Sequence, residues 1–240
     1  MSLALAVRSA LLALIQVIVT PLFAILSLLT FPLPLRGRYA VISWWARGMV
    51  TLARVLCGIR YRVIGANHIP HEPCVIVSKH QSAWETFVFQ VIFPPQVWVL
   101  KRELLWIPFF GWGLAMLAPI AIDRGSGARA LRQTVEQGSD RLRRGFCVVI
   151  FPEGTRVAPG ERRTYQPGGA LLAVRTGAPA LPVAHNAGVC WPRNGFLKRP
   201  GLITISIGPA IAPQGLTAAE LNRRIEIWIE SEMPHLDDHE

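Results

Sequence analysis

The chain has 240 residues, of which 51% are hydrophobic and 17% are charged, with a formal net charge of +10 and a mean hydropathy of +0.35. These values exclude a disordered chain, and the length allows one domain with a large core plus an appendage. Residues 1–150 carry the positive charge, with 16 Lys and Arg against 6 Asp and Glu, whereas residues 151–240 hold 9 of each. Nearly all basic residues are Arg, which suits phosphate or an anionic membrane surface. Nucleic acid is not an expected partner, because no basic run interleaved with aromatic residues and no zinc-finger or RRM-type motif is present.

The cysteines and histidines show no spacing typical of a disulfide framework or a metal site. Cys57, Cys74, Cys147 and Cys190 include no C-x-x-C pair, and the six histidines include no H-E-x-x-H motif. We expect small core thiols in a reducing compartment, and neither a metal nor another cofactor.

The N-terminal segment is predicted to attach the protein to a membrane. Residues 9–31 form an uncharged stretch of 23 residues, long enough to cross the hydrocarbon core of a bilayer. The stretch is too long for the apolar part of a signal peptide, and no A-x-A-like cleavage site follows it. Residues 39–56 are amphipathic at helical spacing, with tryptophans suited to the membrane interface. Residues 1–57 are therefore predicted to be a two-helix membrane anchor, either a transmembrane helix followed by an interfacial helix or a hairpin that enters one leaflet.

Residues 58–240 show the pattern of an α/β domain, in which short Val- and Ile-rich runs alternate with helical ones. This alternation predicts a mixed, largely parallel sheet flanked by helices. The expected strands are residues 61–64, 74–78, 97–100, 120–122, 146–151, 180–184 and 203–207. The expected helices are residues 82–93, 105–116, 128–144, 169–176 and 217–230.

The first chemical motif follows the strand 74–78 and contains His80 and Glu85. Residues five apart do not share a helix face, so His80 must precede the helix if the two side chains act together. Ser82 and Glu85 form a Ser-x-x-Glu capping box, in which Ser82 would be the N-cap residue. Glu85 could simply cap the helix, or it could orient His80 as a general base. The two roles are compatible.

The second motif is the sequence Phe-Pro-Glu-Gly-Thr-Arg at residues 151–156, at the end of another buried strand. The Gly154 backbone and Arg156 could hold a phosphate, with Glu153 orienting Arg156; the alternative is a surface turn with a local ion pair. Between the motifs, Lys101 and Arg102 precede an aromatic, apolar stretch at residues 106–113. Such a stretch suits an amphipathic substrate, or it is a core helix flanked by two surface cations.

These motifs resemble the four sequence blocks of the glycerolipid acyltransferases, and among them the 1-acyl-sn-glycerol-3-phosphate acyltransferases. The resemblance covers residues 60–210 and rests on the His-x4-Glu block, the 101–111 stretch, Asp123-Arg124, the Glu-Gly-Thr-Arg block and the strand around residues 181–183. It implies that His80 is the base and Glu85 its acidic partner. It also implies that the acceptor phosphate is bound by residues of the second and third blocks: Glu153, Gly154, Thr155, Arg156, Lys101 and Arg102.

The same resemblance implies a fatty acyl donor on coenzyme A or acyl carrier protein and a lysophospholipid acceptor. Transfer to the sn-2 hydroxyl of 1-acyl-sn-glycerol 3-phosphate would give phosphatidic acid at the membrane, on the cytoplasmic face of the inner membrane. Two departures concern the site: the family usually has Asp in place of Glu85, and often has a Lys where this chain reads Tyr165-Gln166-Pro167-Gly168. Arg162 or Arg163 could supply that contact, or the acceptor could be another lysolipid.

Two further functions stay open on the residues alone. Ser82 or a cysteine could be the nucleophile of a lipid hydrolase, although a G-x-S-x-G motif is absent. The chain could also be a non-catalytic module whose arginines bind anionic lipid.

Overall fold

A computed structural model describes residues 3–236 and shows one seven-stranded sheet. The strand order is β1-β7-β6-β2-β5-β3-β4, and every neighbouring pair is parallel except β6 and β7. The prediction of a mixed, largely parallel sheet is confirmed, and each of the seven expected strands is present. The strands are β1 (Ile59–Ile64), β2 (Val75–Ser78), β3 (Gln96–Lys101), β4 (Ile120–Ile122), β5 (Cys147–Ile150), β6 (Ala180–His185) and β7 (Gly201–Ile207).

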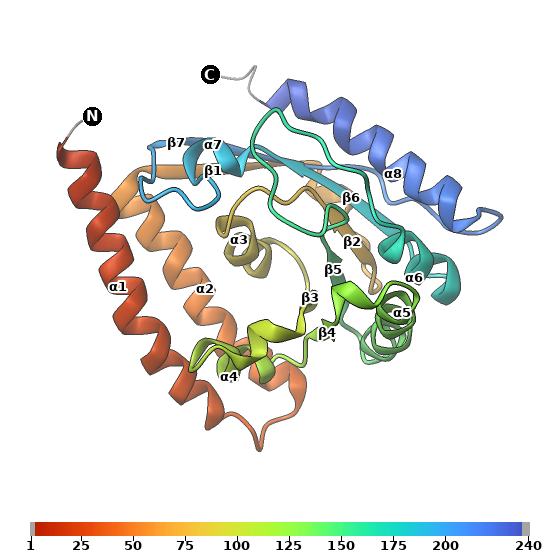
Figure 1. The fold of residues 1–240 in the computed structure, drawn as a ribbon, viewed down its shortest axis with the longest axis horizontal. Helices are drawn as coiled ribbons and strands as arrows, with labels where there is room; N and C mark the ends of the chain where they lie inside the picture. Colours follow the sequence, from red (N-terminus) through yellow and green to blue (C-terminus); the bar gives the residue numbers. More distant parts are fainter. Residues whose placement is uncertain (1–2, 237–240) are drawn as a thin grey trace.

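Helices cover both faces of the sheet (Figure 1). One face carries α5 (Ala128–Arg143), α6 (Gly168–Thr176) and α8 (Ala218–Glu232), and the other carries α3 (Trp84–Ile92) and α2 (Leu35–Cys57). Every residue of β2 and β5 is buried, which explains their continuous apolar sequences, because strands covered on both faces need no polar alternation.

The N-terminal helices form a hairpin packed on the domain, not a detached appendage. In Figure 1, α1 (Leu3–Leu28) runs beside α2 along one side of the molecule. Met49, Ala53 and Cys57 of α2 are buried in the same hydrophobic core as the sheet. The core therefore continues across the predicted boundary at residue 57.

The prediction of one continuous helix over residues 105–116 is wrong. The structure has a 3-10 turn at Arg102–Trp106 and then the short helix α4 (Phe110–Ala115). Pro108 separates them, because proline lacks the N–H group that a continuous helix needs, and Phe109 follows with a positive φ of 62°. Shorter elements complete the described chain: α7 (Ala187–Cys190) and the 3-10 turns Ala66–His68, Arg124–Ser126 and Met233–Leu236.

Candidate active site

The two central strands β2 and β5 bring the two sequence motifs together. They pair in parallel, with Val77 opposite Ile150, so the chain leaves both strands at the same edge of the sheet. The His80 backbone N–H donates to Oε2 of Glu153 at 2.8 Å, and the His80 carbonyl accepts from the Val157 N–H at 2.7 Å. The turn after β5 thus holds His80 on both sides of its backbone.

Glu85 and His80 form a direct pair. Nδ1 of His80 lies 2.8 Å from Oε1 of Glu85, which is completely buried. The same oxygen accepts the backbone N–H groups of Gln81 at 3.0 Å and Ser82 at 2.8 Å. Three donors therefore fix one carboxylate oxygen, and Nε2 of His80 is left for a substrate.

The predicted capping box forms only in half, and this corrects the assignment of Ser82 as the N-cap residue. Helix α3 begins at Trp84, with Ala83 at the N-cap position. Glu85 accepts the Ser82 N–H as a capping box requires, but Oγ of Ser82 accepts the N–H of Trp84 at 3.1 Å instead of that of Glu85. Ser82 is also completely buried, which argues against its use as the nucleophile of a hydrolase.

Electrostatics and packing keep the pair in a state suited to base catalysis. Burial alone would raise the pKa of Glu85, but the neighbouring His185, the contact with His80 and the Ser82 N–H together hold this pKa below its usual value. The ring of His80 stacks on Phe151, with centroids 3.9 Å apart and an interplanar angle of 14°. A charged carboxylate on Nδ1 and a fixed ring plane are what a positioned general base needs.

Glu153 does not orient Arg156, contrary to the sequence interpretation. In the described chain its carboxylate meets Nζ of Lys79 at 2.8 Å and the His80 N–H, both at the base of the turn. Burial raises the pKa of Glu153, while the Lys79 ammonium and the His80 N–H act to lower it. Both carboxylate oxygens thus face protein donors.

The rest of the turn continues beyond this buried carboxylate. Gly154 has a φ of 68°, which favours glycine at this position, and Thr155 and Arg156 follow it. Within residues 3–236 no carboxylate pairs with the Arg156 guanidinium. An unpaired guanidinium beside a glycine turn can take up an anion.

His80 and Arg156 line the same cavity, which has a volume of about 210 Å³. Its other walls are mainly apolar and come from α1, α2, α3, β3 and α4, with Phe23, Trp45 and Phe87 among them. The site thus combines the imidazole of His80, the guanidinium of Arg156 and an apolar chamber, and this combination suits an amphipathic substrate.

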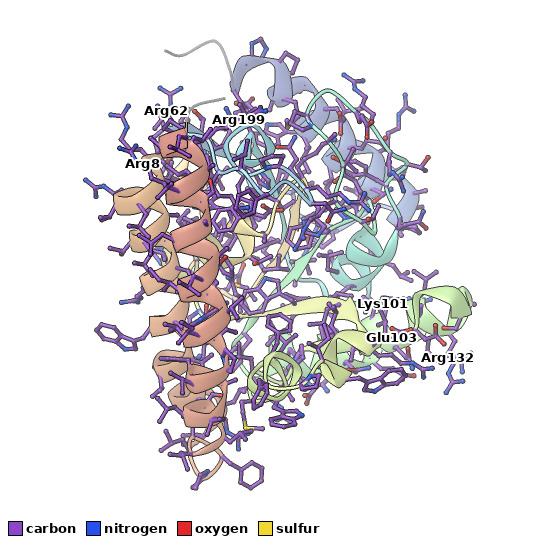
Figure 2. The ribbon with its side chains drawn as sticks, turned by 60° about the vertical axis from the view of Figure 1, so that its left-hand side comes forward. Arg8, Arg62, Lys101, Glu103, Arg132 and Arg199 are labelled. Carbon is purple, nitrogen blue, oxygen red and sulfur yellow. The ribbon has the colours of Figure 1, made fainter. Side chains whose placement is uncertain are left out.

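Lys101 and Arg102 are not among the residues that line this cavity, although Leu100 and Leu104 are. The Lys101 ammonium is 3.7 Å from Glu103, and the Arg102 guanidinium is 3.7 Å from Asp123. Figure 2 shows Lys101 beside Glu103, and both side chains are partly exposed. Their binding of the acceptor phosphate stays a prediction, and so does that of Glu153.

The sequence reasoning missed two buried residues behind the His80–Glu85 pair, Lys79 and His185. Lys79 directly precedes His80, and its ammonium is almost completely buried, which nothing in the sequence indicated. His185 ends β6 and is completely buried; burial lowers its pKa, although the nearby Glu85 opposes this. A histidine at the end of a predicted strand, beside the fourth block, was the only available signal for it.

Comparisons with known proteins show the family of the chain. The family model described as "Acyltransferase" matches residues 60–186. The chain is 50% identical to a 1-acyl-sn-glycerol-3-phosphate acyltransferase of Pseudomonas aeruginosa, over 85% of this chain and 81% of that protein. The chain belongs to the acyltransferase family. This acyltransferase is also 31% identical to the human 1-acyl-sn-glycerol-3-phosphate acyltransferase alpha, over 80% of this chain and 69% of the human protein.

The fold of this acyltransferase matches a solved structure. The crystal structure of the 1-acyl-sn-glycerophosphate (LPA) acyltransferase PlsC from Thermotoga maritima aligns with a TM-score of 0.77, at 22% identity. The alignment covers 97% of this chain and 94% of that chain, so it includes the N-terminal helices.

Proposed function

We propose that this enzyme transfers a fatty acyl group to the sn-2 hydroxyl of 1-acyl-sn-glycerol 3-phosphate and so forms phosphatidic acid. The donor is a fatty acyl thioester of coenzyme A or acyl carrier protein. The observation that carries the proposal is the shared cavity, in which a carboxylate-bound imidazole and an unpaired guanidinium meet an apolar chamber. The relatives named for this reaction support the choice of acceptor.

The reaction proceeds by direct transfer, without an acyl-enzyme. Nε2 of His80 takes the proton of the acceptor hydroxyl as its oxygen attacks the thioester carbonyl carbon. Glu85 stabilises the imidazolium that forms. The carbon–sulfur bond then breaks, and the departing thiolate takes the proton from His80 and leaves as a thiol.

The acceptor phosphate is bound at the turn after β5. Arg156 supplies the guanidinium and Thr155 a hydroxyl, while Gly154 shapes the turn, in which its N–H donates to the Phe151 carbonyl at 3.1 Å. Glu153 contributes by fixing the base of this turn, because its oxygens meet Lys79 and His80. Lys101 and Arg102 attract the anionic acceptor from outside the cavity.

The apolar chamber takes the acyl chain of the donor. Its walls include Thr20, Ala24 and Ser27 of α1 and Ile42 of α2, so the N-terminal helices form part of the binding site. A fatty acyl chain is the part of either substrate that such walls can bury.

The N-terminal hairpin attaches the enzyme to one leaflet of the bilayer, on the cytoplasmic face of the inner membrane. Both helices are long and apolar enough to cross a membrane, and only 17% of the most apolar window of α1 is buried. However, α1 and α2 pack beside the domain, so a spanning hairpin would draw the sheet into hydrocarbon. Exposed apolar side chains at the hairpin end, such as Leu29 and Phe31, would enter the leaflet.

An acceptor panel tests this function. Purified enzyme in detergent is given labelled acyl-CoA or acyl carrier protein with lysophosphatidic acid, lysophosphatidylcholine or monoacylglycerol. We expect transfer to lysophosphatidic acid, and Arg156→Ala should raise its KM by about tenfold or more while changing the use of monoacylglycerol little. Equal use of monoacylglycerol and lysophosphatidic acid by the wild-type enzyme would contradict the proposal.

A further inference from the structure

The side chain of Lys79 lies almost completely buried between the active site and the C-terminal helix. Its ammonium meets Oε1 of Glu153 at 2.8 Å and Oε1 of Glu230 on α8 at 2.7 Å. The side chains of Lys79, Glu153 and Glu230 are only 2%, 0% and 12% exposed. Burial of this depth makes an ion pair sensitive to the loss of one partner, because the remaining charge has no compensation.

The backbone of Lys79 is held as firmly as its side chain. Its N–H donates to the Val183 carbonyl at 3.1 Å, and its carbonyl lies 2.9 Å from Nε2 of His185. Nδ1 of His185 accepts the Ala187 N–H at 3.3 Å, so Nε2 carries the proton and donates to Lys79. The next peptide N–H, that of His80, donates to Glu153. Hydrogen bonds and ion pairs therefore fix both the backbone and the side chain of Lys79, which directly precedes His80.

Glu230 links this arrangement to residues far along the chain. Its Oε1 accepts the hydroxyl of Tyr165 at 2.9 Å, and its Oε2 lies 3.1 Å from Nε of Arg162. Residue 230 lies outside the segment 60–186 that matches the family model, so the family motifs do not account for it. Arg162 is engaged here, and this explains why it does not face the cavity as a substitute phosphate ligand.

We propose that Lys79, whose ammonium lies between Glu153 and Glu230, is a positioning residue. It fixes the position of the His80 backbone and connects that backbone to the C-terminal helix. The inference rests on the proposed function for its kinetic consequences. The ammonium favours the ionised form of Glu153 against the effect of burial, and Oε2 of Glu153 accepts the His80 N–H. This hydrogen bond and the contact between Glu85 and Nδ1 together fix the direction of Nε2. Lys79 touches neither the substrate nor the reacting atoms.

The charges around Glu153 predict how the arrangement responds to pH. Lys79 at the end of β2, Glu230 of α8 and Tyr165 before α6 surround this carboxylate, and Glu226 of α8 acts on Tyr165. Removal of the Lys79 charge leaves Glu153 and Glu230 repelling each other, which raises the pKa of Glu153 further. Activity that needs ionised Glu153 is then lost at a higher pH on the acid side.

The test compares Lys79→Met, Glu230→Gln and the double variant with the wild-type full-length enzyme. Glu232→Gln is the matched control, because it removes the same charge from the same helix, where Glu232 bonds Ser206 instead of Lys79. Thermal unfolding is recorded for each protein. Measurements are kcat and KM for both substrates, the pH profile of kcat and the ring resonances of His80, assigned by comparison with His80→Ala.

We expect Lys79→Met to lower kcat by about 10²-fold with both KM values changed less than about twofold. The acid limb of its kcat–pH profile should move to higher pH, and its His80 resonances should shift. Glu232→Gln should resemble the wild type in both measurements. The double variant should recover kcat by about threefold over Lys79→Met, because one of two repelling carboxylates is gone. If Lys79→Met does not fold, Glu230→Gln provides the test. Its kcat, the acid limb of its pH profile and its His80 resonances should change in the same direction as expected for Lys79→Met, but by less.

A folded Lys79→Met with wild-type kcat and unchanged His80 resonances overturns the inference, as does a loss confined to KM. Failure of the wild type to acylate lysophosphatidic acid contradicts the proposed function alone. In that case the His80 resonances still decide whether Lys79 positions the ring.

Discussion

At the residue scale, Glu85 serves two purposes with one carboxylate oxygen. Oε1 accepts the N–H groups of Gln81 and Ser82 at the start of α3 and also meets the imidazole of His80. The position of the oxygen depends on the length of the side chain, because the helix that carries Glu85 is buried and cannot shift freely.

Substitutions at Glu85 should separate charge from length. Glu85→Gln removes the charge that stabilises the imidazolium, so kcat should fall about 10²- to 10⁴-fold. Glu85→Asp keeps the charge but withdraws the oxygen from His80, so its kcat should fall about tenfold and stay above that of Glu85→Gln. Steady-state kinetics on both folded variants checks this order. A Glu85→Gln enzyme with the higher kcat would contradict the role assigned to the charge.

How far the sequence predicts the site depends on how many residues separate the two partners of each contact along the chain. His80 and Glu85 are five residues apart, so the spacing and the expected helix start allowed the two side chains to meet, and the family resemblance named them as a pair. The Lys79–Glu230 pair joins residues 151 positions apart, and no local pattern carries that information. For the same reason the sequence suggested Arg156 as the partner of Glu153, three residues away, where the structure has Lys79.

At the element scale, the strands were predicted well because β2, β5 and their neighbours are short runs of Val and Ile bounded by polar residues. The order of strands in the sheet did not follow, since it depends on how distant segments pair. The break before α4 was missed, although Pro108 marks it. This break matters because it turns α4 against α1, where both helices line the cavity.

The close approach of α4 to α1 leads to a prediction about chain length. A Cβ atom at Gly113 would lie 3.3 Å from Cβ of Ala24 and from Oγ of Ser27, and all three residues line the cavity. Gly113→Val should therefore narrow the chamber and lower kcat/KM for a C18 acyl-CoA by about tenfold relative to a C10 acyl-CoA. Competition assays with the two donors measure this ratio, and Gly215→Val, at an exposed turn, controls for a general loss of stability. An unchanged ratio would show that the acyl chain lies elsewhere.

At the scale of the whole molecule, basic side chains and exposed apolar side chains gather at different ends of the N-terminal hairpin. Figure 2 places Arg8, Arg62 and Arg199 together near the start of α1, away from the hairpin turn. Exposed apolar residues lie at the turn, and Trp106 and Trp112 lie exposed around α4. This separation supports the proposal that the enzyme enters one leaflet, with the tryptophans at the interface and the basic groups beyond it.

Cysteine labelling distinguishes a hairpin from a spanning helix. The native cysteines are buried, so single cysteines introduced at exposed residues can be detected by their reaction with a membrane-impermeant maleimide. We expect Leu3→Cys and His71→Cys to react from the same side of sealed vesicles, and Leu29→Cys to be protected from both sides. Labelling of Leu3→Cys from the side opposite to His71→Cys would mean that α1 crosses the bilayer.

The proposed reaction depends on the imidazole of His80, and removal of this ring is the most direct test. Purified wild-type enzyme and His80→Ala, matched for thermal unfolding, are mixed with saturating labelled acyl-CoA and lysophosphatidic acid, and the initial rate of phosphatidic acid formation is measured. We predict that the rate of His80→Ala is lower by at least about 10²- to 10⁴-fold. A folded His80→Ala that forms phosphatidic acid at the wild-type rate would contradict the mechanism.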